Sequence, residues 1–323
     1  MKKIYIETMG CQMNKSESER IIGMLSHFGY EECENPRDAD LLIVNTCSIR
    51  QLSANKAYSQ IGVWGKWKRH RNIKIGFCGC VAQQDGEKLI KRFPYLDLVF
   101  GTHNIYEIPE LIKKVEAGEQ VCAITEKPYM VEQTQYNIAR KGNLNAWVPI
   151  IEGCNNFCTY CIVPYTRGRE RSRNMESIIK ETQIAVQQGF KEITLLGQNV
   201  DSYGKDFKDR EYRLADLLRE VNAIDGKFRI RFVTSYPTDI TEELIDAVVE
   251  LDKVCEYFHI PMQSGDDVVL KKMNRRYDVK TYTQICNHIR EKIKDVTITS
   301  DFIAGFPGET EEDFEDTLDV VEK

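Results

Sequence analysis

Residues 147–161 have the sequence WVPIIEGCNNFCTYC, in which three cysteines follow an apolar run with the spacing CxxxCxxC. The run Val148–Ile151 predicts a buried strand. Three thiolates at this spacing, Cys154, Cys158 and Cys161, can each hold one iron of a 4Fe-4S cube and leave the fourth iron without a protein ligand. That open iron could bind a substrate directly, which a cluster held by four cysteines cannot do.

Two other metal or thiol sites could use the same residues. A zinc site needs a fourth ligand, and no His or Cys follows closely in the sequence. A redox-active thiol pair would use Cys158 and Cys161 but would not need Cys154. The spacing after a strand therefore favours an iron–sulfur cluster over both alternatives.

An alternating pattern of strands and helices continues from this loop to the end of the chain. It predicts a partial (β/α) barrel with its site at the C-terminal ends of the strands. Because the pattern stops at Lys323 inside a helix, we expect the barrel, in a domain of residues 140–323, to be truncated. The expected strands are Val148–Ile151, Glu192–Leu196, Arg229–Thr234, Glu256–Ile260 and Thr297–Ile303, with helices such as Met175–Gln188 and Asp278–Lys292 between them.

The first 120 residues form a separate alternating pattern, which predicts an α/β domain with an open parallel sheet. Cys11, Cys47 and Cys80 each lie just past the end of a different strand, and ligands bind at that edge of such sheets. The alternative is three unrelated small residues, and spacing alone cannot choose between Cys78 and Cys80. Residues 121–139 are expected to be a linker. The expected strands are Lys3–Thr8, Asp40–Asn45, Ile73–Phe77 and Leu96–Phe100, with helices at Ser16–Phe28 and near Asp85–Arg92.

Composition limits the remaining possibilities. The chain has 323 residues, eleven cysteines and a formal net charge of −6. An odd cysteine count in a long chain fits a disulfide scaffold poorly, and clustered cysteines in a reducing compartment usually bind metal. No apolar run approaches the ~20 residues of a membrane helix, so we expect a cytoplasmic protein. A nucleic acid would have to be held by local basic patches.

The cysteine loop resembles that of the radical S-adenosylmethionine (SAM) superfamily. Together with Cys11, Cys47 and Cys80 it resembles the methylthiotransferases, whose pattern at residues 79–83 selects Cys80. Residues 9–14 (MGCQMN) are similar to the branch that modifies dimethylallyl-adenosine in tRNA, and residues 45–50, 196–200 and 262–265 agree. The resemblance implies two 4Fe-4S clusters: an auxiliary one on Cys11, Cys47 and Cys80 that delivers sulfur, and one on the CxxxCxxC loop that binds SAM.

The resemblance also implies a reaction and partners. The chain would be a transferase that adds a methylthio group to C2 of dimethylallyl-adenosine at position 37 of tRNA, next to the anticodon. It would need a flavodoxin or ferredoxin type of electron donor and a sulfur source, and would act as a monomer. One alternative is a methylthiotransferase for threonylcarbamoyl-adenosine in tRNA or for a ribosomal-protein aspartate. Another is a non-catalytic iron–sulfur carrier.

Contacts to SAM and RNA are predicted from strand ends and basic stretches. The alternatives are turns or strand-end polar residues for the first group, and a solvated surface for the second. No catalytic acid, base or nucleophile is predicted, and Cys33, Cys122, Cys255 and Cys286 are expected to be small buried residues. The predicted SAM contacts are Tyr160, Gln198, Asn199, Ser235, Gln263 and Asp301; the predicted RNA contacts are Lys66, Lys68, Arg69, Arg71, Arg167, Arg169, Arg171 and Arg173.

Overall fold

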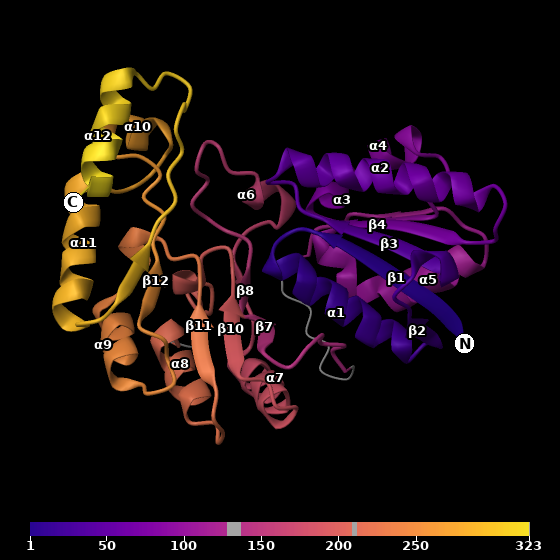
Figure 1. Ribbon diagram of the computed structural model, residues 1–323, viewed down its shortest axis with the longest axis horizontal. Helices are drawn as coiled ribbons and strands as arrows, with labels where there is room; N and C mark the ends of the chain where they lie inside the picture. The colour runs from indigo at the N-terminus through magenta and orange to yellow at the C-terminus, as the bar shows by residue number, and fades with distance from the viewer. Residues whose placement is uncertain (128–136, 209–211, 323) are drawn as a thin grey trace. The chain divides into compact units, whose positions relative to one another are not determined.

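The computed structural model describes residues 1–127, 137–208 and 212–322 (Figure 1). The chain divides into two compact units. The N-terminal unit comprises Met1–Gly142 together with Tyr165–Arg169, and the C-terminal unit comprises Asn143–Pro164 and Glu170–Lys323. Among the described helices, none is long and apolar enough to cross a membrane.

The N-terminal unit is built on a six-stranded sheet in which all neighbouring strands run parallel, in the order β2-β1-β3-β4-β5-β6. This confirms the predicted open parallel sheet. The pattern missed β2 and β6, in each of which only the first of three residues is buried, and β6 lies inside the predicted linker. The strands are β1 (Lys2–Met9), β2 (Tyr30–Glu32), β3 (Leu41–Thr46), β4 (Lys74–Gly79), β5 (Leu98–Phe100) and β6 (Val121–Ala123).

Helices cover both faces of this sheet (Figure 1). Successive residues of β3 point to opposite faces, so Leu41 and Ile43 pack with α1 and α5, whereas Leu42 and Val44 pack with α2, α3 and α4. Because both faces are covered, the first four residues of β3, Leu41–Val44, are all apolar. The helices are α1 (Gln12–Ser26), α2 (Gln51–Lys68), α3 (Cys80–Asp85), α4 (Glu87–Arg92) and α5 (Ile108–Glu116), with short 3₁₀ turns η1 (Pro36–Asp38) and η2 (Thr102–Glu107).

The C-terminal unit contains the predicted series of parallel strands. β10 lies between β7 and β11, β12 pairs with β13, and isolated bridges at Ile230–Val254 and Gln263–Phe302 continue the pairing. Phe232 and Phe258 lie in the single core beneath these strands. The partial barrel is thus confirmed: β10 has the predicted bounds, β7 begins and ends earlier than predicted, and β11, β12 and β13 are shorter than predicted. They are β7 (Asn145–Pro149), β10 (Glu192–Leu196), β11 (Arg229–Phe232), β12 (Tyr257–His259) and β13 (Thr297–Thr299).

The helices of this unit begin and end at ordinary capping residues. Asp278 caps α11 by accepting a hydrogen bond of 2.7 Å from the Thr281 backbone N–H, and Gly189 follows α7 with a left-handed φ of 93°. The helices are α6 (Val163–Thr166), α7 (Met175–Gln187), α8 (Leu214–Asn222), α9 (Glu242–Glu250), α10 (Asp267–Lys272), α11 (Val279–Lys292) and α12 (Glu311–Glu322), with η3 (Val200–Ser202) and η4 (Pro237–Asp239).

The strand before the cysteine loop differs from the prediction. It ends at Pro149, which lacks a backbone N–H to donate. The chain then forms a short antiparallel pair between β8 (Ile151–Glu152) and β9 (Arg171–Ser172). This pair closes the base of the loop that carries Cys154, Cys158 and Cys161.

Candidate metal centres

The first centre lies at the carboxyl edge of the N-terminal sheet. Cys11 follows β1, Cys47 follows β3 and Cys80 follows β4, and the Cys47 thiol shares hydrogen bonds with both other thiols. The order of the strands reverses between β1 and β3, which is where ligands bind in such sheets. The structure therefore brings the three predicted cysteines together.

Gly79 explains why Cys80 rather than Cys78 reaches this centre. Gly79 has a left-handed φ of 92°, and a Cβ there would lie 2.5 Å from the Thr46 carbonyl oxygen. The turn at Gly79 carries Cys80 to the sheet edge, whereas Cys78 remains 1% exposed in the apolar core. Sequence spacing alone could not distinguish the two residues.

The three thiols of this centre differ in pKa. Hydrogen bonding to Cys47, with the nearby positive charge of Arg167, lowers the pKa of Cys11 to about 5 and that of Cys80 to about 6. The same shared hydrogen bonds raise the pKa of Cys47. The lowered pKa values favour the thiolate forms of Cys11 and Cys80, and a thiolate is the form that binds iron.

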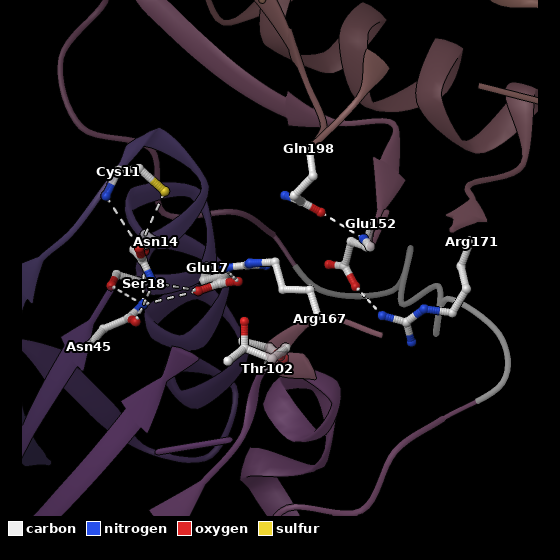
Figure 2. A network of polar contacts seen from close by, with 12 residues as sticks. Cys11, Asn14, Glu17, Ser18, Asn45, Thr102, Glu152, Arg167, Arg171 and Gln198 are labelled. Carbon is white, nitrogen blue, oxygen red and sulfur yellow. Dashed lines mark hydrogen bonds and ion pairs between the residues drawn. The ribbon is translucent and has the colours of Figure 1, made fainter. Parts of the chain in front are cut away.

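A buried polar network fixes this centre (Figure 2). The Asn14 Oδ1 accepts from the Cys11 backbone N–H at 3.2 Å, and its Nδ2 donates to the Asn45 Oδ1 at 3.0 Å. The Arg167 guanidinium forms an ion pair of 2.7 Å with Glu17, and both side chains are 4% exposed. Arg167 also hydrogen-bonds the Cys80 thiol. The thiols are thus held by groups that are themselves locked in place.

The second centre is the loop of Cys154, Cys158 and Cys161 in the C-terminal unit. All three residues are half-buried and lie within electrostatic range of one another. Burial raises the pKa of Cys154 to about 11 and also raises that of Cys161. At its start the loop is anchored by Gln198, whose Oε1 accepts from the Gly153 backbone N–H at 2.7 Å (Figure 2).

The segment after α10 holds the other side of the loop. The Thr159 N–H donates to the Met273 carbonyl at 3.1 Å, and the Asn274 Nδ2 donates to the Phe157 carbonyl at 3.0 Å. Arg275 donates to the Cys158 Sγ at 3.5 Å. Phe157 and Asn274 have left-handed φ values of 49° and 58°. The backbone is therefore in a rarely populated conformation on both sides of this contact.

The donor sets fit iron–sulfur clusters and SAM. No group of three His, Cys, Asp or Glu among the described residues is gathered as a single metal ion would require. In a 4Fe-4S cube each thiolate binds a different iron, so a trio of cysteines need not converge on one point. Beside the second centre, Asn199 is 2% exposed and its Oδ1 has no hydrogen-bond partner. A ligand hydroxyl or ammonium would satisfy this buried oxygen.

Three predicted SAM contacts are already hydrogen-bonded within the protein. The Gln198 Oε1 accepts from the Gly153 N–H, so the side-chain oxygen is already engaged and only the Nε2 is left to face a ligand. The Asn199 Nδ2 donates to Asp239 at 2.6 Å. The Ser235 hydroxyl donates to Asp201 at 3.2 Å.

The other three predicted SAM contacts differ in exposure. Tyr160 is 38% exposed. Gln263 is half-buried and has a left-handed φ of 79°, and Thr234, at the end of β11, has a φ of 80°. Such strain at two neighbouring strand ends is typical of functional sites. Asp301 has a 74% exposed side chain, so it does not contribute to an enclosed pocket.

The second predicted RNA stretch needs correction. Arg171 pairs with Glu152 at 3.0 Å, Arg173 pairs with Glu181, and Arg167 pairs with Glu17. These three guanidiniums are less than 8% exposed, so they are structural and we remove them from the predicted RNA contacts. Arg169 remains exposed. Sequence shows the charge of such residues but not the buried carboxylates that compensate it.

The first predicted RNA stretch lies at the C-terminal end of α2. Lys66, Arg69 and His70 are exposed and Arg71 is half-buried. With Arg37 and Trp67 they line a shallow hollow of about 690 Å³, and Arg37 lies 5.4 Å from the Trp67 ring centre. Lys68 is the exception, since it is engaged with Asp97 at 2.6 Å.

Several residues of the two centres were not predicted from the sequence. Glu17, Asp201 and Arg275 belong to no recognised motif, and only their contacts mark them. Of the four remaining cysteines, Cys286 is buried as expected, whereas Cys33, Cys122 and Cys255 are half-buried.

Comparison with known families places both units. Residues 148–321 match the Radical SAM superfamily, and residues 3–101 match the Uncharacterized protein family UPF0004. The chain is 48% identical, over its full length and 71% of the relative, to a tRNA-2-methylthio-N(6)-dimethylallyladenosine synthase of Clostridium botulinum. It is 49% identical to the enzyme of that name from Clostridium perfringens, over 100% of the chain and 73% of the relative.

Solved structures share the fold over the entire chain. The radical S-adenosylmethionine methyltransferase TsrM of Kitasatospora setae, with cobalamin and a [4Fe-4S] cluster, has a TM-score of 0.69 at 13% identity and is covered over 70% of its length. The cobalamin-dependent SAM radical enzyme OxsB has the same score at 11% identity and is covered over 52%. This chain belongs to the radical SAM superfamily and, within it, to the family of tRNA-2-methylthio-N(6)-dimethylallyladenosine synthases.

Proposed function

We propose that this chain transfers a methylthio group to dimethylallyl-adenosine in tRNA, at C2 of the base at position 37. The observation that carries the proposal is the presence of two separate cysteine trios, each at the end of a parallel strand or strands. An electron carrier would need neither two trios nor the unpartnered polar oxygen of Asn199 beside one of them.

The residues of the first centre hold an auxiliary 4Fe-4S cluster. Cys11, Cys47 and Cys80 supply three thiolates, and the fixed network of Asn14 and Asn45 keeps Cys11 in position. Three protein ligands leave one iron for an exogenous sulfur atom. Arg167, held by its ion pair with Glu17, lies beside Cys80, and its guanidinium favours the thiolate forms of Cys11 and Cys80.

The residues of the second centre hold the cluster that binds SAM. When bound, the clusters and SAM supply the methyl group, the sulfur and the radical chemistry that an unactivated C–H bond requires. Cys154, Cys158 and Cys161 are the ligands, and the chain's own contribution is to fix their loop from both sides. Asn199 and the amide nitrogen of Gln198 are the groups best placed to orient SAM, because neither the Asn199 Oδ1 nor the Gln198 Nε2 is used within the described protein.

RNA is held in part by the exposed basic hollow at the end of α2. Lys66, Arg69 and Arg71 can contact phosphates, and Trp67 offers a ring for stacking. A flavodoxin or ferredoxin type of electron donor, a sulfur source, a monomeric state and a cytoplasmic location belong to the same proposal.

The test is anaerobic reconstitution followed by mass spectrometry of tRNA nucleosides. We expect about eight irons per chain from two cubes. With SAM, a reductant and tRNA that carries dimethylallyl-adenosine, the 2-methylthio nucleoside should accumulate. Parallel reactions with threonylcarbamoyl-adenosine tRNA and with ribosomal proteins test the alternative targets. The proposal would be overturned if protein with eight irons formed no product. It would also be overturned if the spectrum of the reduced cluster did not change on addition of SAM.

A further inference from the structure

Arg275 has an unusual position beside the second centre. It follows the α10 segment that grips the cysteine loop, and its Nη1 donates to the Cys158 Sγ at 3.5 Å. It is the one charged side chain among the described contacts of the loop with that segment. The others, from Thr159 and Asn274, are neutral and act on the backbone.

The guanidinium is held in a single orientation. Its Nε donates to the Tyr277 hydroxyl at 2.6 Å, and its Nη2 donates to the Pro261 carbonyl at 2.8 Å. The ring centres of Tyr236 and Tyr277 lie 4.5 and 4.9 Å from its central carbon. Two of its nitrogens are hydrogen-bonded and two tyrosine rings contact the guanidinium, so the remaining nitrogen is directed at the sulfur of Cys158. A residue that only packed against the loop would not need this many fixed contacts.

The charge of Arg275 is not compensated by a carboxylate. Its described partners are a hydroxyl, a backbone carbonyl, a thiol and two aromatic rings, and no acidic side chain pairs with it in the described part of the chain. A full positive charge therefore lies next to a predicted cluster ligand. The potential of an iron–sulfur cluster depends on the net charge around it and on hydrogen bonds to its sulfur ligands.

We infer that Arg275 is a positioning residue that donates an N–H···S hydrogen bond to Cys158 and favours the reduced form of the SAM-binding cluster. Reduction adds one electron, from an added reductant such as dithionite, and so makes the cluster more negative. A fixed cation stabilises that state and raises the midpoint potential. The inference depends on the proposed assignment of Cys158 to this cluster.

The experiment measures the midpoint potential rather than activity. All proteins carry Cys11→Ala, Cys47→Ala and Cys80→Ala in the full-length chain, so that only the second centre can hold iron. Arg275→Gln and Arg275→Lys are compared with Arg276→Gln, which changes an exposed neighbouring arginine. Each protein is reconstituted anaerobically, assayed for iron and sulfide, and titrated with dithionite while the reduced cluster is followed by electron paramagnetic resonance.

We expect Arg275→Gln to shift the midpoint potential to more negative values at an unchanged four irons per chain. Arg275→Lys keeps the charge but loses the planar array of donors, so its potential should lie between the two. Arg276→Gln should match the background protein. If Arg275→Gln fails to hold iron, Arg275→Lys alone decides: a lowered potential supports the inference.

Two results would overturn it. One is a midpoint potential in both Arg275 variants that equals the potential of the background protein. If only Arg275→Lys holds iron, the same result in that variant alone would suffice. The other is an equal shift in Arg276→Gln, which would mean that any nearby charge has the same effect. Failure of the proposed function would look different, because the background protein itself would then hold no cluster, or its reduced spectrum would not change on addition of SAM.

Discussion

The two cysteine centres use buried charge in opposite ways. At the first centre Arg167 touches Cys80, and its charge is neutralised by Glu17 at 2.7 Å. At the second centre Arg275 touches Cys158 without a carboxylate partner among the described residues. Nearby, the buried carboxyl of Asp201 is bonded to a hydroxyl and a backbone N–H rather than to a cation.

This difference indicates what each centre requires. At the first centre the ion pair holds Arg167 in one orientation, where its guanidinium favours the thiolate forms while Glu17 balances its charge. An uncompensated guanidinium costs solvation energy and is retained where its field is useful. In the proposed function the second centre accepts an electron, and a cation without a carboxylate partner beside it would stabilise that reduced state.

The largest predicted effect is the loss of one centre at a time. Cys47→Ala removes the thiol that bridges Cys11 and Cys80, and Cys158→Ala removes the middle ligand of the loop. Each variant should retain about four irons, from the remaining cube. Cys47→Ala should still cleave SAM in the presence of a reductant, whereas Cys158→Ala should not, as judged by 5′-deoxyadenosine formation.

The control for that experiment is Cys78→Ala, in a residue that is buried beside Cys80 but lies in the apolar core. It should keep about eight irons. If Cys47→Ala and Cys158→Ala lost the same cluster, or if either kept both, the division into two independent centres would be wrong.

The next effect is on stability at the first centre. Glu17→Gln leaves Arg167 buried without a counter-charge, and breaking such a pair costs about 3–5 kcal/mol of unfolding free energy. Anaerobic urea denaturation measures this change. The matched control is Glu110→Gln, which breaks the surface pair with Lys113 and should cost less than about 1 kcal/mol. Equal losses in the two variants would show that the buried pair has no special importance.

The sequence predicted where both cysteine trios lie because the ends of strands can be recognised from the alternating pattern of apolar runs. Parallel strands end at a common edge, so Cys11, Cys47 and Cys80 had to converge once the alternating pattern was recognised. The apolar run before Cys154 likewise placed the second trio at the end of a strand. Choosing Cys80 over Cys78 required the family pattern, and its physical cause, the left-handed turn at Gly79, is visible only in the structure.

The charged residues could not be assigned in the same way. Arg171 and Arg173 belong to a basic stretch that resembles an RNA-binding surface, but Glu152 and Glu181 neutralise them from positions that the stretch does not reveal. No sequence motif singles out Glu17 or Arg275, since their importance comes from contacts between segments far apart in the chain. Gln198 was placed at the correct loop, but its oxygen is committed to the Gly153 backbone.

A smaller effect should appear as a pH dependence at the second centre. Burial raises the pKa of Asp201 from 3.8 to about 7, and the neighbouring Asp239 adds to the shift. The folded state therefore binds this proton more tightly than the unfolded state. Its contribution to stability is present below about pH 4 and is lost as the pH rises towards 7, at up to about 1.4 kcal/mol per pH unit.

Asp201→Asn should remove this part of the slope in unfolding free energy, measured by urea denaturation between pH 5.5 and 7.5. Asn can still accept the hydrogen bond from Ser235, so the contact survives in part. The control is Asp225→Asn in an exposed residue, which should leave the slope unchanged. A wild-type slope in Asp201→Asn would place the titrating group elsewhere and would remove Asp201 from the contrast with Glu17.

The smallest predicted effect is on tRNA binding by the exposed basic residues that belong to neither cysteine centre. Because Arg167, Arg171 and Arg173 are committed to internal pairs, the exposed cations at the end of α2 should bear more of the RNA affinity. Lys66→Glu with Arg69→Glu should weaken tRNA binding about 5- to 10-fold at moderate salt and reduce the salt dependence by about one to two phosphate contacts. Filter binding over a range of salt concentrations measures both quantities.

The matched control is Lys88→Glu with Lys91→Glu, which makes the same change of charge on α4 of the same unit, at two other exposed lysines. It should change affinity much less, because it lies outside the hollow lined by Arg37, Trp67 and Arg71. Equal weakening by both changes would mean that tRNA responds only to net charge. In that case the hollow would have no local role, and the RNA contacts would have to be sought on other exposed surfaces such as that of Arg169.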